Sequence, residues 1–168
     1  MRDSIRSLGL GLCHGVGDAS AGFVLVALAL HAPIASSASL VLIYNLAAFG
    51  LQAVFAPWID RWRLPRWAAL ASPALAGVAL LIGRFWPSEG AVAAAFTVGL
   101  ASALLHVGAG ALALELSGGR ATGIGLFAAP GVVGLAIGGA IVSQGDAALL
   151  ALLTGLLISG VVIVSFEP

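Results

Sequence analysis

The chain has 168 residues, of which 61% are hydrophobic and only 8% charged, and its mean hydropathy is +1.13. A soluble domain carries about 25% charged residues. This chain has too few charges to cover a surface that faces water, so its solvent must be a lipid bilayer. The formal net charge of zero leaves no case for nucleic acid as a partner. The single cysteine, Cys13, excludes an intrachain disulfide and a cysteine-based metal cluster.

Six apolar segments follow one another along the chain, separated by short stretches rich in Pro, Gly, Ser or charge. Each segment is close to the length of about 20 residues that a membrane-spanning helix needs. The sequence therefore predicts an all-α membrane protein with one six-helix domain over residues 1–168. Because the loops are short, consecutive helices should be antiparallel neighbours. We expect the spans at 8–31, 38–58, 65–85, 91–115, 121–142 and 146–165.

The first predicted span contains a polar pair. Residues 10–31 read LGLCHGVGDASAGFVLVALALH, with His14 and Asp18 well inside the apolar run. A charged Asp at a helix centre costs about 2.5–3.5 kcal/mol on insertion scales, so such residues usually face a bundle interior or a water-filled cavity. Four residues apart, the two side chains share a helical face and can interact. Because Asp18 interrupts the apolar core, we expect a retained span rather than a signal peptide.

Polar residues also occur in the second and fourth predicted spans. Asn45 and Gln52 are seven residues apart and share a face, and we expect them to form hydrogen bonds between helices rather than to bind substrate. The neighbouring Tyr44 suits either a cavity or an interhelical contact. His106 lies about midway along the fourth span.

The fifth predicted span, GIGLFAAPGVVGLAIGGAI, is rich in glycine. Small residues let helix backbones approach closely, and helix association in lipid depends on such packing. Gly134 and Gly138 form one Gly-x-x-x-Gly face of this kind. Pro130 removes a backbone hydrogen bond in mid-helix and should bend the span.

The arginines indicate how the helices are oriented. If the spans alternate, six arginines fall on one side of the membrane and only Arg84 on the other. Basic residues in short loops favour the cytoplasm, so both termini are expected there, in a cytoplasmic membrane of bacterial type. Four tryptophans near predicted helix ends fit interfacial positions: Trp58, Trp62, Trp67 and Trp86. The six arginines are Arg2, Arg6, Arg61, Arg63, Arg66 and Arg120.

The loop between the second and third spans reads APWIDRWRLPRW. It resembles the cytoplasmic loop signature of the major facilitator superfamily, roughly G-x-L-x-D-R-x-G-R-[KR]. Asp60 and Arg61 match the Asp-Arg core of that signature. Ala56 and Arg63 stand where the signature has glycines, and Arg66 supplies a basic residue slightly displaced.

Two further places extend the resemblance. The fifth span is similar to the family's motif G-x8-G-x3-G-P, with glycine in place of the proline. The turn after the fourth span carries an acidic residue and an arginine, Glu115 and Arg120, as the family often does. The glycines that follow the motif's spacing are Gly125, Gly134, Gly138 and Gly139.

Within the superfamily, the chain looks closest to the fosmidomycin-resistance type of exporter. Those proteins tend to have His-x-x-x-Asp in the first helix, here His14 and Asp18, and a phrase like the ALLHVGAGALALEL of the fourth span. The resemblance covers the whole chain but only the first half of a family member, because such transporters have two six-helix halves. It implies one half of a major-facilitator-type bundle.

The resemblance also implies that the first and fourth helices line a central cavity, which places His14, Asp18 and His106 in it. Asp18 would accept a proton, and the histidines would carry protons or contact substrate, since imidazole titrates near neutral pH. Alternatively, His14 and Asp18 only satisfy each other and His106 donates to a carbonyl. A metal site from these three is conceivable. No ligand spacing beyond the i,i+4 pair favours it, so we expect neither a metal nor a cofactor.

Four charged residues at the cytoplasmic helix ends have two interpretations. In the superfamily, such groups form a charge network that holds the inward gate shut in one state. The simpler interpretation is anchoring by the positive-inside rule. The residues concerned are Asp60, Arg61, Glu115 and Arg120.

These features together predict a secondary transporter that moves a small molecule or ion by alternating access, coupled to protons through Asp18. One chain supplies one six-helix bundle, which alone would expose to lipid the face that carries His14, Asp18 and His106. We therefore expect a parallel homodimer, with a related half as the rival partner. The alternative is a non-transporting assembly or sensory subunit. A transporter should keep its polar groups facing a wet space, whereas a scaffold should bury them in direct pairs. No catalytic set or phosphate loop indicates an enzyme.

Overall fold

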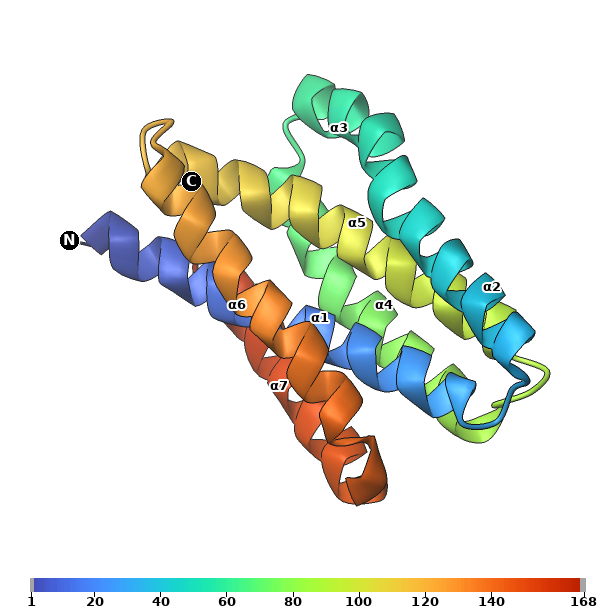
Figure 1. Ribbon diagram of the computed structural model, residues 1–168. Coiled ribbons are helices and arrows are strands. Elements are labelled where there is room, and N and C mark those ends of the chain that lie inside the picture. Colours follow the sequence, from blue (N-terminus) through green and yellow to red (C-terminus); the bar gives the residue numbers. More distant parts are fainter. Residues whose placement is uncertain (1, 167–168) are drawn as a thin grey trace.

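The computed structural model describes residues 2–166, and its regular elements are all helical (Figure 1). The chain forms seven α-helices, a π-helix, η1, in the second span, and a 3-10 turn, η2, before the last helix. In chain order they are α1 (Arg2–Ala29), α2 (Ile34–Asn45), η1 (Leu46–Gly50), α3 (Leu51–Trp62), α4 (Pro65–Phe85), α5 (Ala91–Leu116), α6 (Ala121–Ala140), η2 (Val142–Gln144) and α7 (Asp146–Ser165).

Six helical segments are long and apolar enough to cross a membrane, with α2, η1 and α3 acting as one continuous span. The prediction of an all-helical fold with six segments that could span a membrane is therefore confirmed. Two of the expected ranges, 65–85 and 146–165, coincide with α4 and α7.

The expected boundaries differ from the structure mainly in the first two spans. The first span was expected at 8–31, but α1 runs from Arg2 to Ala29. The second span was expected at 38–58, but helix runs from Ile34 to Trp62. Pro33 directly precedes α2, where its missing N–H disrupts no helical hydrogen bond. The small residues at 35–37, which were expected in a loop, therefore lie in the first turn of α2. Arg63, with φ of 52°, ends α3 in the left-handed conformation, and Pro65 begins α4.

The two ends of the bundle carry different loops. Both ends of the described chain lie at the same end of the bundle as the α3–α4 and α5–α6 connections (Figure 1). The α1–α2, α4–α5 and α6–α7 connections lie at the opposite end. The basic loop residues thus gather at one end, while Arg84 lies at the other and pairs with Asp146 at 2.9 Å. Both partners of this pair are exposed.

The first three spans and the last three spans make corresponding contacts. If the first, second and third spans are exchanged with the fourth, fifth and sixth, most of the main helix contacts are replaced by contacts that also occur. The first span packs along the fifth, α1 on α6, and the fourth packs along the second, α5 on α2, η1 and α3. In the same way α5 packs on α4, and α1 on α7. The exchange swaps α1 with α5 and α4 with α7, so it leaves the α1–α5 and α4–α7 contacts unchanged. Only the contact of α1 with α4 lacks a counterpart. Each set contains three spans, which is an odd number, so corresponding helices of the two sets run in opposite directions.

Glycine lets α1 and α6 come into backbone contact. Gly134 lies against the backbone of Gly15, and Gly138 against that of Ala19, so closely that a Cβ at either glycine would overlap backbone atoms. Such backbone contact is how transmembrane helices pack when lipid provides no hydrophobic driving force. It brings the middle of α1, where His14 and Asp18 lie, onto α6.

Candidate functional site

His14 lies on α1, and three contacts with α6 fix the position of its ring. Its Nδ1 lies 3.0 Å from the carbonyl oxygen of Phe127, and its ring stacks on that of Phe127 with centroids 4.5 Å apart and planes 12° from parallel. Gly131 leaves the space that the ring fills, because a Cβ there would lie 2.6 Å from Nε2. Only 3% of His14 is exposed. Because a carbonyl oxygen only accepts, Nδ1 donates, and in the neutral ring the lone pair is on Nε2.

Asp18 lies one turn further along α1. Its Oδ2 is 3.1 Å from His14 Nε2, a distance within ion-pair range. The pair is not aligned as a hydrogen bond, so Nε2 has no hydrogen-bond partner among the described residues, and neither has Asp18 Oδ1. Asp18 is 8% exposed. A buried carboxylate oxygen without a partner is costly, and such groups call for an explanation.

His106 on α5 completes the group. Its Nδ1 is 2.8 Å from the carbonyl oxygen of Ser102, one turn earlier, and its ring meets that of His14 edge to face, with centroids 4.5 Å apart. One ligand atom from each of His14, Asp18 and His106 lies within 4.8 Å of the others. We call these three residues the polar centre. His14 and Asp18 are buried in it, and His106 is half-buried.

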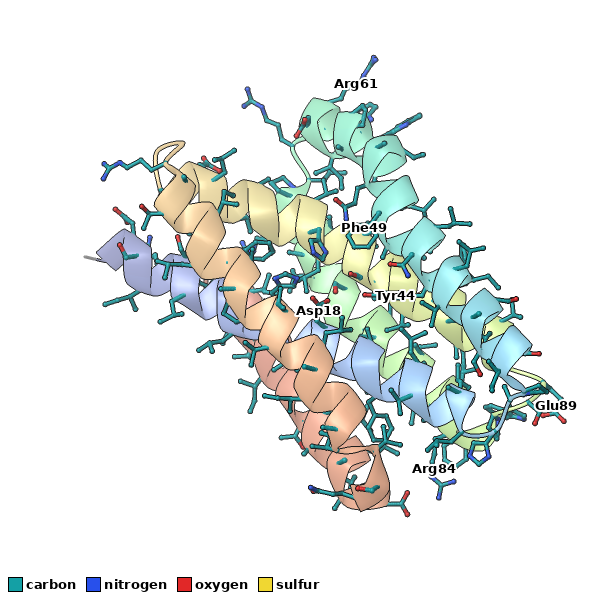
Figure 2. All side chains as sticks on the ribbon, in the orientation of Figure 1. Asp18, Tyr44, Phe49, Arg61, Arg84 and Glu89 are labelled. Atoms are coloured by element: carbon teal, nitrogen blue, oxygen red, sulfur yellow. The ribbon has the colours of Figure 1, made fainter. Side chains whose placement is uncertain are left out.

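The second span forms one wall of the polar centre at its π-helical turn. Tyr44 is buried beside Ser102, and the ring of Phe49 in η1 lies 6.4 Å from that of His106. Asp18, Tyr44 and Phe49 gather about midway along the bundle (Figure 2). A π-helical turn inside an α-helix is rare and often marks a functional site.

Asn45 and Gln52 flank this turn and require a correction. Both were expected to form hydrogen bonds between helices. Instead, Asn45 Nδ2 donates to the carbonyl of Val41 at 2.8 Å, and Gln52 Nε2 donates to that of Ala48 at 2.7 Å, each within its own span. Each amide therefore bonds to the carbonyl four residues earlier in its own span and makes no hydrogen bond to another helix through this nitrogen.

The burial of the polar centre corrects a second expectation. The case for a homodimer assumed that His14 and Asp18 would face lipid in a single copy, but the chain itself buries both. Two apolar grooves lie elsewhere, one formed by α1, α6 and α7 and one by α4 and α7, and neither is lined by the polar centre.

The four charged residues at the helix ends do not form the expected network in this conformation. Asp60, Arg61, Glu115 and Arg120 are exposed. Among the side chains that the structure describes, ion pairs form only between His14 and Asp18 and between Arg84 and Asp146. Figure 2 shows Arg61 at the end of α3, far from Arg84 and Glu89 at the opposite end of the bundle.

The glycines and the proline named from the sequence have different surroundings on α6. Gly134 and Gly138 pack on α1 as described, and the carbonyl of Pro130 lies next to Gly15. Gly139 faces Val26. Gly125 is exposed, with open space where a Cβ would be.

Four contributors to the polar centre were missed by the sequence reasoning: Phe49, Ser102, Phe127 and Gly131. One signal could have found two of them. Phe127, Gly131, Gly134 and Gly138 are spaced by four, three and four residues, which places them on one face of a helix.

Comparison with protein-family models, with curated proteins and with solved structures finds no match to this chain. The class of the protein is therefore defined by its own features. It is an all-helical protein with six segments that could span a membrane and with a largely buried His-Asp-His centre at mid-span.

Proposed function

We propose that the protein is one half of a secondary transporter of the major facilitator kind, which moves a small solute by alternating access. The observation that carries the proposal is Asp18, a carboxylate buried at mid-span next to His14 and within 4.8 Å of His106, with one oxygen unpartnered among the described residues. Ionisable residues inside transmembrane segments are expensive and usually mark a pathway for substrate, ions or protons.

The geometry of Asp18 suits a group that takes up and releases a cation. His14 donates through Nδ1 to the Phe127 carbonyl, so its contact with Asp18 is attractive only when a proton lies on Nε2 or on the carboxyl group. The polar centre thus has a place for one exchangeable proton. We propose Asp18 as the proton acceptor that couples transport to a proton gradient.

The packing of the spans supports the same proposal. Many secondary transporters are built from inverted repeats, with their sites near the bilayer midplane at the repeat interface. Exchanging the first three spans with the last three preserves nearly all the main helix contacts here. The exchange pairs α1 with α5, the helices that carry His14 and His106, so the two rings meet where the proposed repeats meet.

The working unit is proposed to be a parallel homodimer with both termini in the cytoplasm. An even number of spans would return the chain to the side on which it began, and the arginine distribution supports the cytoplasm as that side. Two copies inserted by the same rule have the same orientation, and a two-fold axis along the membrane normal would relate them as the two halves of a full transporter.

A second candidate is a non-transporting assembly or sensory subunit. It is favoured by the burial of His14 and Asp18 in direct contact and by the bond of His106 to a carbonyl. The unpartnered oxygen of Asp18 argues against it, because a scaffold gains nothing from a buried carboxylate that it does not fully pair.

Flux through proteoliposomes tests the proposal. The purified protein is assayed with and without a pH gradient against a panel of metabolites, drugs and metal ions. Asp18→Asn should abolish the gradient-driven flux while the protein stays folded by circular dichroism. Asp146→Asn, which changes an exposed carboxylate in the same way, is the matched control. Wild-type flux in Asp18→Asn would refute the role of Asp18, and absence of flux for every solute would favour the subunit candidate.

A further inference from the structure

The polar centre has the donor set of a transition-metal site. Two imidazoles and a carboxylate suit zinc, iron and cobalt, whereas calcium takes six to eight oxygen ligands and magnesium near-octahedral oxygen. The three ligand atoms lie within 4.8 Å of one another, and they come from two helices that are far apart in sequence. We propose that His14, Asp18 and His106 bind a divalent transition-metal cation.

Distances in the polar centre are close to those that coordination requires. Ligand atoms about 2.0–2.1 Å from a tetrahedral metal are about 3.4 Å from one another. His14 Nε2 and Asp18 Oδ2 are already 3.1 Å apart, without the alignment of a direct hydrogen bond. One ring nitrogen of His106 lies within 4.8 Å of ligand atoms of both other residues, so a modest approach of the His106 side chain brings the set to coordination distance.

The hydrogen bonds around the histidines are those of metal ligands. A metal-binding histidine usually donates its other ring N–H to a carbonyl or carboxylate, which fixes the tautomer and the ring orientation. His14 donates through Nδ1 to Phe127, and His106 donates through Nδ1 to Ser102, at 3.0 and 2.8 Å. In both neutral rings the lone pair is therefore on Nε2. Neither His14 Nε2 nor Asp18 Oδ1 has a hydrogen-bond partner among residues 2–166.

The incomplete ligand set indicates a cargo rather than a structural metal. Structural zinc sites are closed by four protein ligands, whereas three ligands leave an open position. Transport also requires binding that is favourable enough to admit an ion and weak enough to release it. His106 is half-buried, and Phe49 next to it in η1 is 60% exposed, so the polar centre is least covered on this side. The assignment as cargo rests on the proposed transport function, but the binding site does not.

Metal binding by the purified protein, free of any polyhistidine tag and stripped with a chelator, is the test. Co²⁺ is titrated while its visible absorption is recorded, and Zn²⁺ is titrated by calorimetry. We expect one ion per chain and a loss of at least about tenfold in affinity for Asp18→Asn and for His106→Gln. His31→Gln changes the one histidine outside the centre, Asp146→Asn an exposed carboxylate, and Cys13→Ser the only thiol, and these controls should bind as the wild type does.

The outcomes separate the site from the transport function. Absence of Co²⁺ and Zn²⁺ binding by the folded wild type overturns the site, whatever the variants do. Equal binding in His106→Gln and wild type also overturns it. Binding that is weakened in both Asp18→Asn and His106→Gln supports the site, even if proteoliposomes show no flux, in which case the transport proposal fails alone. Flux of another solute by a protein that binds no metal removes the site and leaves the transporter.

Discussion

Gly131→Ala is the substitution that most directly perturbs the contact between α6 and the polar centre. A Cβ at this position would lie 2.6 Å from His14 Nε2 and 2.7 Å from Nδ1, where ordinary contacts begin at 3.4 Å. The ring cannot retreat freely, because it is stacked on Phe127 and donates to the carbonyl of that residue. Either the ring or α6 must therefore move by several tenths of an ångström.

The energy of this movement follows from two opposing effects. Overpacking of a well-packed site costs about 1–3 kcal/mol. Replacing glycine by alanine within a helix returns at most about 1 kcal/mol. The net loss should be about 1–2 kcal/mol, equivalent to about 5–30-fold in the folding equilibrium. The substitution should also lower gradient-driven flux, because it moves His14 Nε2 away from Asp18 Oδ2, which lies 3.1 Å from it in the wild type.

The assay is equilibrium unfolding in mixed micelles, with flux measured in parallel. Gly125→Ala is the matched control, because it makes the same chemical change on the same helix where a Cβ meets nothing within 4 Å. It should be neutral or slightly stabilising. If Gly131→Ala is as stable and as active as Gly125→Ala, the His14 ring does not lie against α6, and the described geometry of the polar centre is wrong.

Three further predictions concern orientation, gating and assembly. Single cysteines at Ser88 and Ser117 should be labelled from opposite sides of the membrane, since they lie at opposite ends of the bundle, and labelling of both from one side would contradict the topology. Asp60→Ala or Arg61→Ala should slow turnover more than it weakens substrate binding, with Glu89→Ala at the other end as control; unchanged turnover would leave both residues as topology anchors. The purified protein should have the mass of a dimer in detergent, and a stable monomer would contradict the proposed homodimer.

The spans could be predicted from sequence because bilayer thickness fixes the length of an apolar helix. The error in the second span has a local cause. Alanine and serine around residues 35–39 are compatible with both helix and loop, and Pro33 signals a break without telling where the next helix starts. The π-helical turn at 46–50 had no local signal, since Leu-Ala-Ala-Phe-Gly reads as ordinary helix.

Part of the polar centre was predictable because His14 and Asp18 are one helical turn apart, and neighbours at that spacing meet on any helix. His106 joins them only through the packing of α1 on α5, which no local pattern reports. The burial of Asp18 within one chain was missed for the same reason. It depends on how closely α6 approaches α1, which is set by the glycine contacts at Gly134 and Gly138.

Alternating access of the polar centre can be measured with a single cysteine next to His106. Ser102 is 6% exposed and lies one turn from His106 on α5. In a Cys13→Ser background, which removes the only native thiol, Ser102→Cys is exposed to a membrane-impermeant thiol reagent from each side of oriented vesicles. A transporter predicts labelling from either side, in proportions that change when the pH gradient is reversed. Protection from both sides under every gradient would contradict the account and identify a closed, non-transporting subunit.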